Sequence, residues 1–228
     1  MFYADYTAGQ WNDGKFGEHT NAFIVEWDSD ATIVGSVSSS TDYTAQNGIG
    51  IAQNVTVPNS WNAAATNLDD TINAAVGGTI NSKVSATVDA GEGNDLINAS
   101  VSNAYGILWA TSTLKGGVGD DTINIVGNVD GIHPSTVLID GGAGADLISI
   151  YGGNNGIHGG TTDVSGSEKS SVSIDSGDGD DQIFITATTR NGIDISNVKI
   201  NGGAGNDLVS ISGGTYGIYG DPTWGNST

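Results

Sequence analysis

Short apolar stretches alternate with glycine-rich stretches through most of the chain, at a nearly constant interval. Residues 137–150 read V-L-I-D-G-G-A-G-A-D-L-I-S-I, which is an apolar segment, a Gly-Gly-x-Gly-x-Asp turn and a second segment of alternating large apolar residues. Alternation at period two is typical of a strand with one buried face. The phrase occurs five times, at Asp95, Asp121, Asp146, Asp181 and Asp207, in steps of 26, 25, 35 and 26 residues. Such self-similarity predicts a solenoid.

Each repeat has room for three short strands: one before the glycine-rich turn, one after it, and a Gly-Ile pair 11 or 12 residues beyond the aspartate. Three strands in about 25 residues bury their apolar faces only when each repeat stacks on the next. The expected inward ladder after the turn is Ile97, Ile123, Ile148, Ile183 and Val209. We therefore expect an all-β fold, a parallel β-helix with three short strands per coil and about seven coils. It should be right-handed, since parallel crossovers are right-handed.

The repeats set the expected domain boundaries. They are firm over residues 63–220, and the β-helix is expected to occupy residues 23–228. Residues 1–22 show no period and are interpreted as an N-terminal cap or irregular segment. The 35-residue repeat carries an insertion at about residues 159–171, and such insertions often form a loop on the binding face. We also expect the chain to be a piece of a longer protein.

Composition and charge bear on the partners that the chain can bind. The chain has 26 acidic residues against 6 Lys plus Arg, a formal net charge of −20. This balance argues against nucleic acid and anionic membranes as partners and favours cations. The absence of cysteine excludes a disulfide framework. With no apolar run near ~18 residues, we expect no membrane insertion of this segment.

The glycine-rich turns have the chemistry of a calcium site. Strands of a sheet lie about 4.8 Å apart, so an ion midway between stacked turns lies about 2.4 Å from oxygens on each, within the calcium range and too far for magnesium. Glycine at positive φ turns its carbonyl toward such an ion, and stacked carboxylates repel by roughly 3 kcal/mol without one. The alternative is a purely structural turn whose aspartates bond nearby amides. Five aspartates at one position favour calcium, with about four ions. The expected ligands are Asp95, Asp121, Asp146, Asp181 and Asp207 with Gly91, Gly93, Gly117, Gly119, Gly142, Gly144, Gly177, Gly179, Gly203 and Gly205.

The turn motif resembles a known one, G-G-x-G-x-D-x-U-x with U a large apolar residue, the calcium-binding nonapeptide of RTX (haemolysin-type) proteins. Residues 116–124, 141–149 and 202–210 match it, while two further copies replace the first glycine with Ala90 and Ser176. The family has two nonapeptides per coil of about 18 residues, whereas this chain has one per coil of about 25, so calcium would line one edge only.

The resemblance implies a function as well as a site. It implies a calcium-binding structural or adhesive module of a secreted or surface-displayed bacterial protein, similar to adhesin and autotransporter passenger domains. The expected location is extracellular or at the bacterial cell surface. The expected partners are calcium and, beyond it, a carbohydrate or another surface protein, and we favour a non-catalytic role.

Two other columns of residues leave an alternative open. The residue after each Gly-Ile pair gives Leu108, His133, His158, Asp194 and Tyr219. This column is either a transition-metal or catalytic site or a solvated polar ladder, and the ladder is favoured because two histidines lack a firm third ligand. The alternative function is a polysaccharide-modifying enzyme (lyase, hydrolase or epimerase type), or its accessory carbohydrate-binding module, acting through the face of His133, His158 and Asp194. A second column could stack against and bond sugar rings, or could equally be ordinary turn composition: Tyr105, Asp130, Asn155, Asn191 and Tyr216.

Overall fold

A computed structural model describes most of the repeat region. The described residues are 33–37, 42–44, 51–56, 61–64, 69–77, 83–100, 104–159 and 169–220. The expected cap at residues 1–22 lies outside them, as does most of the insertion at 159–171. The described residues form strands and no helix, so no helix there has the length and apolar character needed to cross a membrane.

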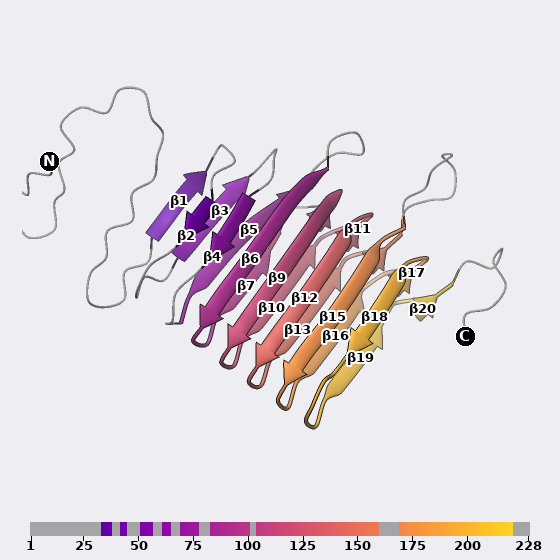
Figure 1. The fold of residues 1–228 in the computed structure, drawn as a ribbon. Coiled ribbons are helices and arrows are strands. Elements are labelled where there is room, and N and C mark those ends of the chain that lie inside the picture. The colour runs from indigo at the N-terminus through magenta and orange to yellow at the C-terminus, as the bar shows by residue number, and fades with distance from the viewer. Residues whose placement is uncertain are drawn as a thin grey trace, which may run out of the picture.

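The strands form parallel sheets in which each strand pairs with its equivalent in the neighbouring coil (Figure 1). The first sheet has the order β18 (Asn197–Asn201), β15 (Ser171–Asp178), β12 (Thr136–Ala143), β9 (Ala110–Val118), β6 (Val84–Glu92), β4 (Trp61–Ala64) and β2 (Asp42–Thr44). The second has β19 (Leu208–Ser212), β16 (Gln182–Ala187), β13 (Leu147–Gly152), β10 (Thr122–Gly127), β7 (Leu96–Ala99) and β5 (Thr71–Gly77), with β3 (Ile51–Thr56) beside β5 and β1 (Ile33–Val37) beside β3. The third has β8 (Tyr105–Leu108), β11 (Asp130–His133), β14 (Asn155–His158), β17 (Asn191–Asp194) and β20 (Tyr216–Tyr219), with β5 also pairing β8.

The expected all-β parallel β-helix with three strands per coil is confirmed, but the number of coils is smaller than expected. About five coils carry all three strands, beginning with β6, β7 and β8, rather than seven. Upstream, β5 serves the second and third sheets in one strand, and β1 to β4 join only the first or second. This part of the chain includes residues 67–74 (N-L-D-D-T-I-N-A), which resemble the repeated phrase around Asp70 but lack the inner glycines that make the tight turn in the later repeats.

The core consists of the predicted inward ladders. Ile97, Ile123 and Ile148 lie directly opposite one another in β7, β10 and β13, and each is at most 1 % exposed. The Gly-Ile pairs supply a second column through Ile107, Ile132 and Ile157. In the last described coil the equivalent Val209 and Ile218 are 44 % and 64 % exposed, because no described coil covers them. Stacking is therefore what buries each coil.

Glycine is required in the turns for two reasons. Among the described residues, the glycines at positive φ are the ten expected ones, from Gly91 (φ 103°) to Gly205 (φ 140°). They also lie where backbones of adjacent coils approach closely: a Cβ on Gly117 would overlap the carbonyl oxygen of Gly91, and one on Gly119 would overlap that of Gly93. A side chain at either position would strain its own turn and push the coils apart.

Substituting Gly117 tests this requirement. We expect Gly117→Ala to lower the free energy of unfolding by about 3 kcal/mol or more, because the added methyl group meets a neighbouring backbone at a φ of 121°. Gly220→Ala is the matched control, since no described residue lies within 4 Å of a Cβ there. It should change the urea unfolding curve by no more than about 0.5 kcal/mol. Equal effects of the two substitutions would contradict the stacking argument.

Candidate functional site

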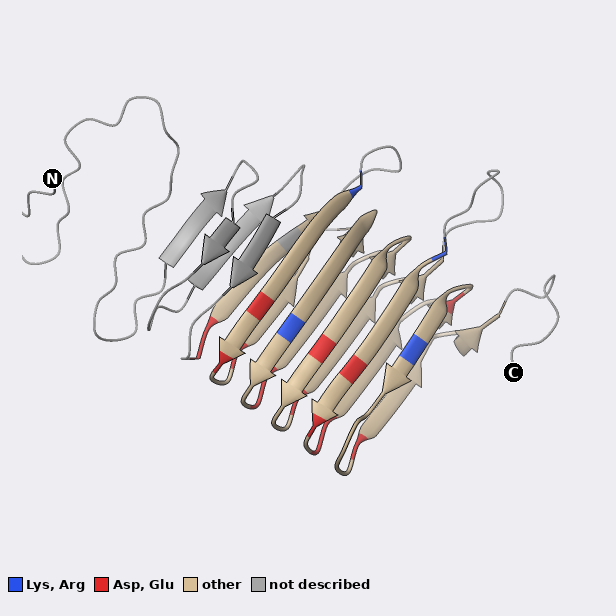
Figure 2. Ribbon diagram, viewed as in Figure 1, with Lys and Arg blue, Asp and Glu red and all other residues tan. Residues whose placement is uncertain are grey.

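The five motif aspartates come together on one edge of the β-helix. Each directly precedes a strand of the second sheet: Asp95 before β7, Asp121 before β10, Asp146 before β13, Asp181 before β16 and Asp207 before β19. Acidic residues mark these turns as a file along the solenoid (Figure 2). We call these five residues the aspartate edge. The ten predicted glycines lie in the same turns.

One oxygen of each carboxylate holds the neighbouring coil. The backbone N–H of Asp95 donates to Oδ1 of Asp121 at 2.8 Å, and that of Asp121 donates to Oδ1 of Asp146 at 2.8 Å. The bonds continue from Asp146 to Asp181 at 2.8 Å and from Asp181 to Asp207 at 3.2 Å. The aspartates therefore do bond nearby amides, as the purely structural interpretation of the turns expects.

The other oxygen is not accounted for by that interpretation. Oδ2 of Asp95, Asp121, Asp146 and Asp181 is buried and has no hydrogen-bond partner in the described part of the chain. In two of these turns it faces a bare glycine, since a Cβ added at Gly116 or Gly141 would collide with Oδ2 of the aspartate five residues on. A buried carboxylate oxygen without a partner is strongly unfavourable, and here it recurs in four consecutive coils.

The pKa values of these carboxyl groups reflect their surroundings. Burial raises the pKa of Asp95 and of Asp146 to about 7 and that of Asp121 to about 6. The amide hydrogen bond opposes the shift, and neighbouring aspartates add to it. A bound cation would stabilise the charged form of carboxyl groups that are hard to ionise in this way.

A second ladder lies on the outside of the same turns and runs in the opposite direction. Oδ1 of Asn94 accepts the backbone N–H of Asp120, and Oδ1 of Asp120 accepts that of Ala145, both at 2.8 Å. Asp180 does the same for Asn206 at 2.8 Å. This ladder was not predicted from the sequence. Its signal is the Asn or Asp that precedes the motif aspartate in most copies.

The donor chemistry of the aspartate edge fits a calcium ion. Its unsatisfied groups are carboxylate oxygens, and calcium prefers oxygen ligands. A bound ion would be coordinated by the buried Oδ2 atoms and would satisfy them as acceptors. Asp207 differs from the others because it is exposed in the last described coil.

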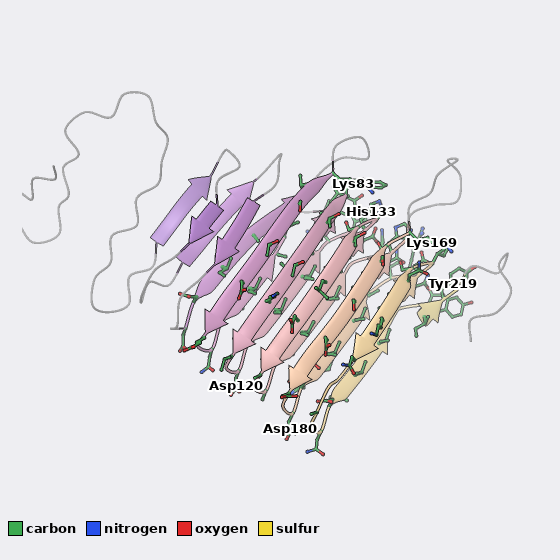
Figure 3. The ribbon with its side chains drawn as sticks, viewed as in Figure 1. Lys83, Asp120, His133, Lys169, Asp180 and Tyr219 are labelled. Atoms are coloured by element: carbon green, nitrogen blue, oxygen red, sulfur yellow. The ribbon has the colours of Figure 1, made fainter. Side chains whose placement is uncertain are left out.

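A second group of titratable residues lies at the opposite edge. Figure 3 shows His133 and Tyr219 far from Asp120 and Asp180, which lie at the glycine-rich turns. The predicted column is confirmed: the rings of His133 and His158 lie 5.1 Å apart, and His158 is paired with Asp194. Asp130 joins them from β11, with Oδ2 at 2.9 Å from Nδ1 of His133 and 3.2 Å from Nδ1 of His158. We call Asp130, His133 and His158 the histidine site.

From the sequence, Asp130 was expected in a different column from the two histidines, so this cluster was not predicted. The usable signal was that Asp130 lies three residues before His133, on the same short strand. Oδ1 of Asp130 accepts the backbone N–H and side-chain Nδ2–H of Asn155, at 3.1 and 2.9 Å. Burial alone would raise the pKa of Asp130, but hydrogen bonds with the two histidines hold it well below the usual range.

The proposed sugar-stacking column is wrong for its central members. Asp130, Asn155 and Asn191 are buried, at 2 %, 2 % and 8 % exposure, and they bond one another instead of facing solvent. Only Tyr105 and Tyr216 at the ends of the column keep accessible rings. Nothing in this column offers a continuous surface to a carbohydrate.

Comparison with known proteins adds no assignment: no protein-family model, no curated protein and no solved structure matches this chain.

The raised pKa values predict an unusual pH dependence in calcium-free buffer. A carboxyl group whose folded pKa is above its unfolded value of 3.8 stabilises the fold below pH 3.8, and this contribution is lost as the pH rises through the folded pKa. Asp121→Asn mimics the neutral form. We expect it to match the unsubstituted chain at pH 3 and to exceed its free energy of unfolding by about 3 kcal/mol at pH 8.

Asp140→Asn on the outer face of β12 is the control for this experiment. Urea unfolding of the three proteins at both pH values separates a general charge effect from one at the aspartate edge. If the Asp121→Asn variant is no more stable than the unsubstituted chain at pH 8, ionisation of Asp121 does not destabilise the fold.

Proposed function

We propose that this chain is a calcium-binding structural module, in which calcium ions bind between stacked glycine-rich turns and hold the coils together. The observation that supports this most directly is the buried Oδ2 that has no hydrogen-bond partner among the described residues in four consecutive turns. A turn that only reversed the chain would need the Oδ1 bond to the next coil and would leave no reason for that second oxygen.

The residues that would hold the ions are the aspartate edge and its ten glycines. Bound calcium supplies positive charge between carboxylates that repel one another. The glycines contribute by permitting the close approach of adjacent turns, and the Oδ1 bonds keep each carboxylate oriented. Because ions would bind the stacked coils and not the unfolded chain, they stabilise the fold by mass action.

The proposed setting follows from that dependence and from the resemblance to RTX repeats. A module that needs millimolar calcium is loose at cytoplasmic calcium levels and folds once outside, which suits a stalk or adhesive segment of a secreted or surface-displayed bacterial protein. The net charge of −20 agrees with a cation-dependent solenoid and with attraction to neither nucleic acid nor anionic lipid. Its outer faces would carry contacts to another surface protein or a carbohydrate.

Calorimetric titration of chelated protein with calcium tests the proposal. We expect about four ions to bind, with a gain of β signal in far-ultraviolet circular dichroism, because five stacked aspartates enclose four intervals. Asp146→Asn should remove roughly two of these ions, since Asp146 lies between Asp121 and Asp181. Asp140→Asn should remove none. Absence of binding, or dichroism that does not respond to a chelator, would contradict a calcium-dependent fold.

A second candidate function is modification of an acidic polysaccharide at the edge that carries His133, His158 and Asp194. The observation that favours it is the convergence of these side chains with Asp130 and with the ring of Tyr105, 4.8 Å from that of His133. This candidate predicts turnover of an acidic glycan and its loss in Asp194→Ala. Calcium-loaded protein that leaves a panel of acidic glycans intact would eliminate it.

A further inference from the structure

Three ligand atoms of the histidine site converge in a small triangle. Oδ2 of Asp130 lies 2.9 Å from Nδ1 of His133 and 3.2 Å from Nδ1 of His158, and the two nitrogens are 3.2 Å apart. The three residues come from β11 and β14, which are adjacent strands of the third sheet. All three are held in the interior or partly in it, with side-chain exposures of 3 %, 19 % and 13 %.

No placement of protons on the two Nδ1 atoms makes all three contacts of this triangle into hydrogen bonds. If both Nδ1 atoms carry hydrogen, both donate to Asp130 but face each other as two donors at 3.2 Å. If only one carries hydrogen, the other presents a lone pair to the lone pairs of the carboxylate. A cation between the three atoms resolves all three contacts, because each atom then contributes a lone pair to it.

The spacing suits one class of cation. Zinc bound tetrahedrally at about 2.0–2.1 Å requires ligand atoms about 3.3–3.4 Å apart, and the observed separations of 2.9–3.2 Å are close to that edge length. Two imidazoles and one carboxylate are a common ligand set for divalent first-row transition metals. We propose that Asp130, His133 and His158 bind one divalent transition-metal ion of the Zn²⁺ type, at the edge opposite the aspartate turns.

The surroundings orient these ligands as an outer shell orients the ligands of a metal site. Nε2 of His158 lies 3.5 Å from Oδ2 of Asp194, so a proton on Nε2 faces a carboxylate and leaves Nδ1 free to bind metal. Asn155 bonds the other oxygen of Asp130 through two N–H groups. Tyr105 and Trp109 lie against the ring of His133, with centroids at 4.8 and 5.7 Å.

Backbone strain is concentrated beside the same cluster. Among the described residues, the non-glycine positions with positive φ are Trp109 at 45° and Ile195 at 44°. Trp109 contacts His133, and Ile195 follows Asp194 in the chain. A β-branched residue in this conformation is rare and unfavourable, and such strain is found most often at functional sites. Both strained residues are thus immediate neighbours of the cluster.

Zinc titration of the calcium-saturated chain tests the proposal, with competition against a chromophoric chelator. We expect one ion per chain. X-ray absorption at the zinc edge should show two imidazole nitrogens and carboxylate oxygen in the first shell. His133→Gln and His158→Gln should each weaken zinc binding at least about 100-fold, and Asp194→Asn about 10-fold, as for an outer-shell partner.

The controls separate this site from the aspartate edge. His19→Gln changes the third histidine of the chain, and Asp140→Asn changes an outer carboxylate; both should leave zinc binding unaltered. Calcium titration of the two histidine variants reports whether the coils still stack. Absence of saturable zinc binding, displacement of zinc by excess calcium, or a zinc edge without imidazole would overturn the proposal, whatever the outcome of the calcium experiments.

Discussion

The stacking of equivalent residues about 4.8 Å apart is the constraint on which this structure depends. In the core it is wholly favourable, because isoleucine on isoleucine builds continuous buried columns such as Ile97, Ile123 and Ile148. At the glycine-rich turns the same geometry places aspartate on aspartate. Burial of these side chains removes water from the carboxylates and raises the pKa of Asp95 and of Asp146 to about 7. Positive charge along that edge would therefore stabilise the fold.

The two edges of the β-helix differ in how their buried polar groups are arranged and bonded. At the aspartate edge each turn repeats the same residue, and Oδ1 bonds the next coil while Oδ2 remains without a partner in the described residues. At the opposite edge the residues change from coil to coil, so Asp130, His133, His158 and Asp194 form one local cluster. A repeated residue suits a row of equivalent oxygen sites, whereas a non-repeated cluster suits a single site with nitrogen ligands.

Periodicity predicted the strands, the inward ladders and the positive φ of the turn glycines, because one repeated phrase fixes all of them. It overestimated the coils, because β5 spans two sheets where the inner glycines of the motif are missing. It also missed contacts between columns. Asp130 was assigned by its position in the repeat, but its carboxylate reaches His133 and His158, and only side-chain geometry reveals that. The outer ladder of Asn94 and Asp120 was missed because it consists of bonds from side-chain oxygens to backbone amides of neighbouring coils, which the repeat pattern alone does not reveal.

The most direct test of the calcium proposal is a crystal structure grown with a calcium analogue that scatters anomalously, such as a lanthanide. The account predicts a row of anomalous peaks along the aspartate edge, about 4.8 Å apart and each between two motif turns. Turns free of anomalous density, or peaks confined to the exposed outer carboxylates, would contradict it. The turns would then be held by their Oδ1 bonds alone, with Oδ2 protonated.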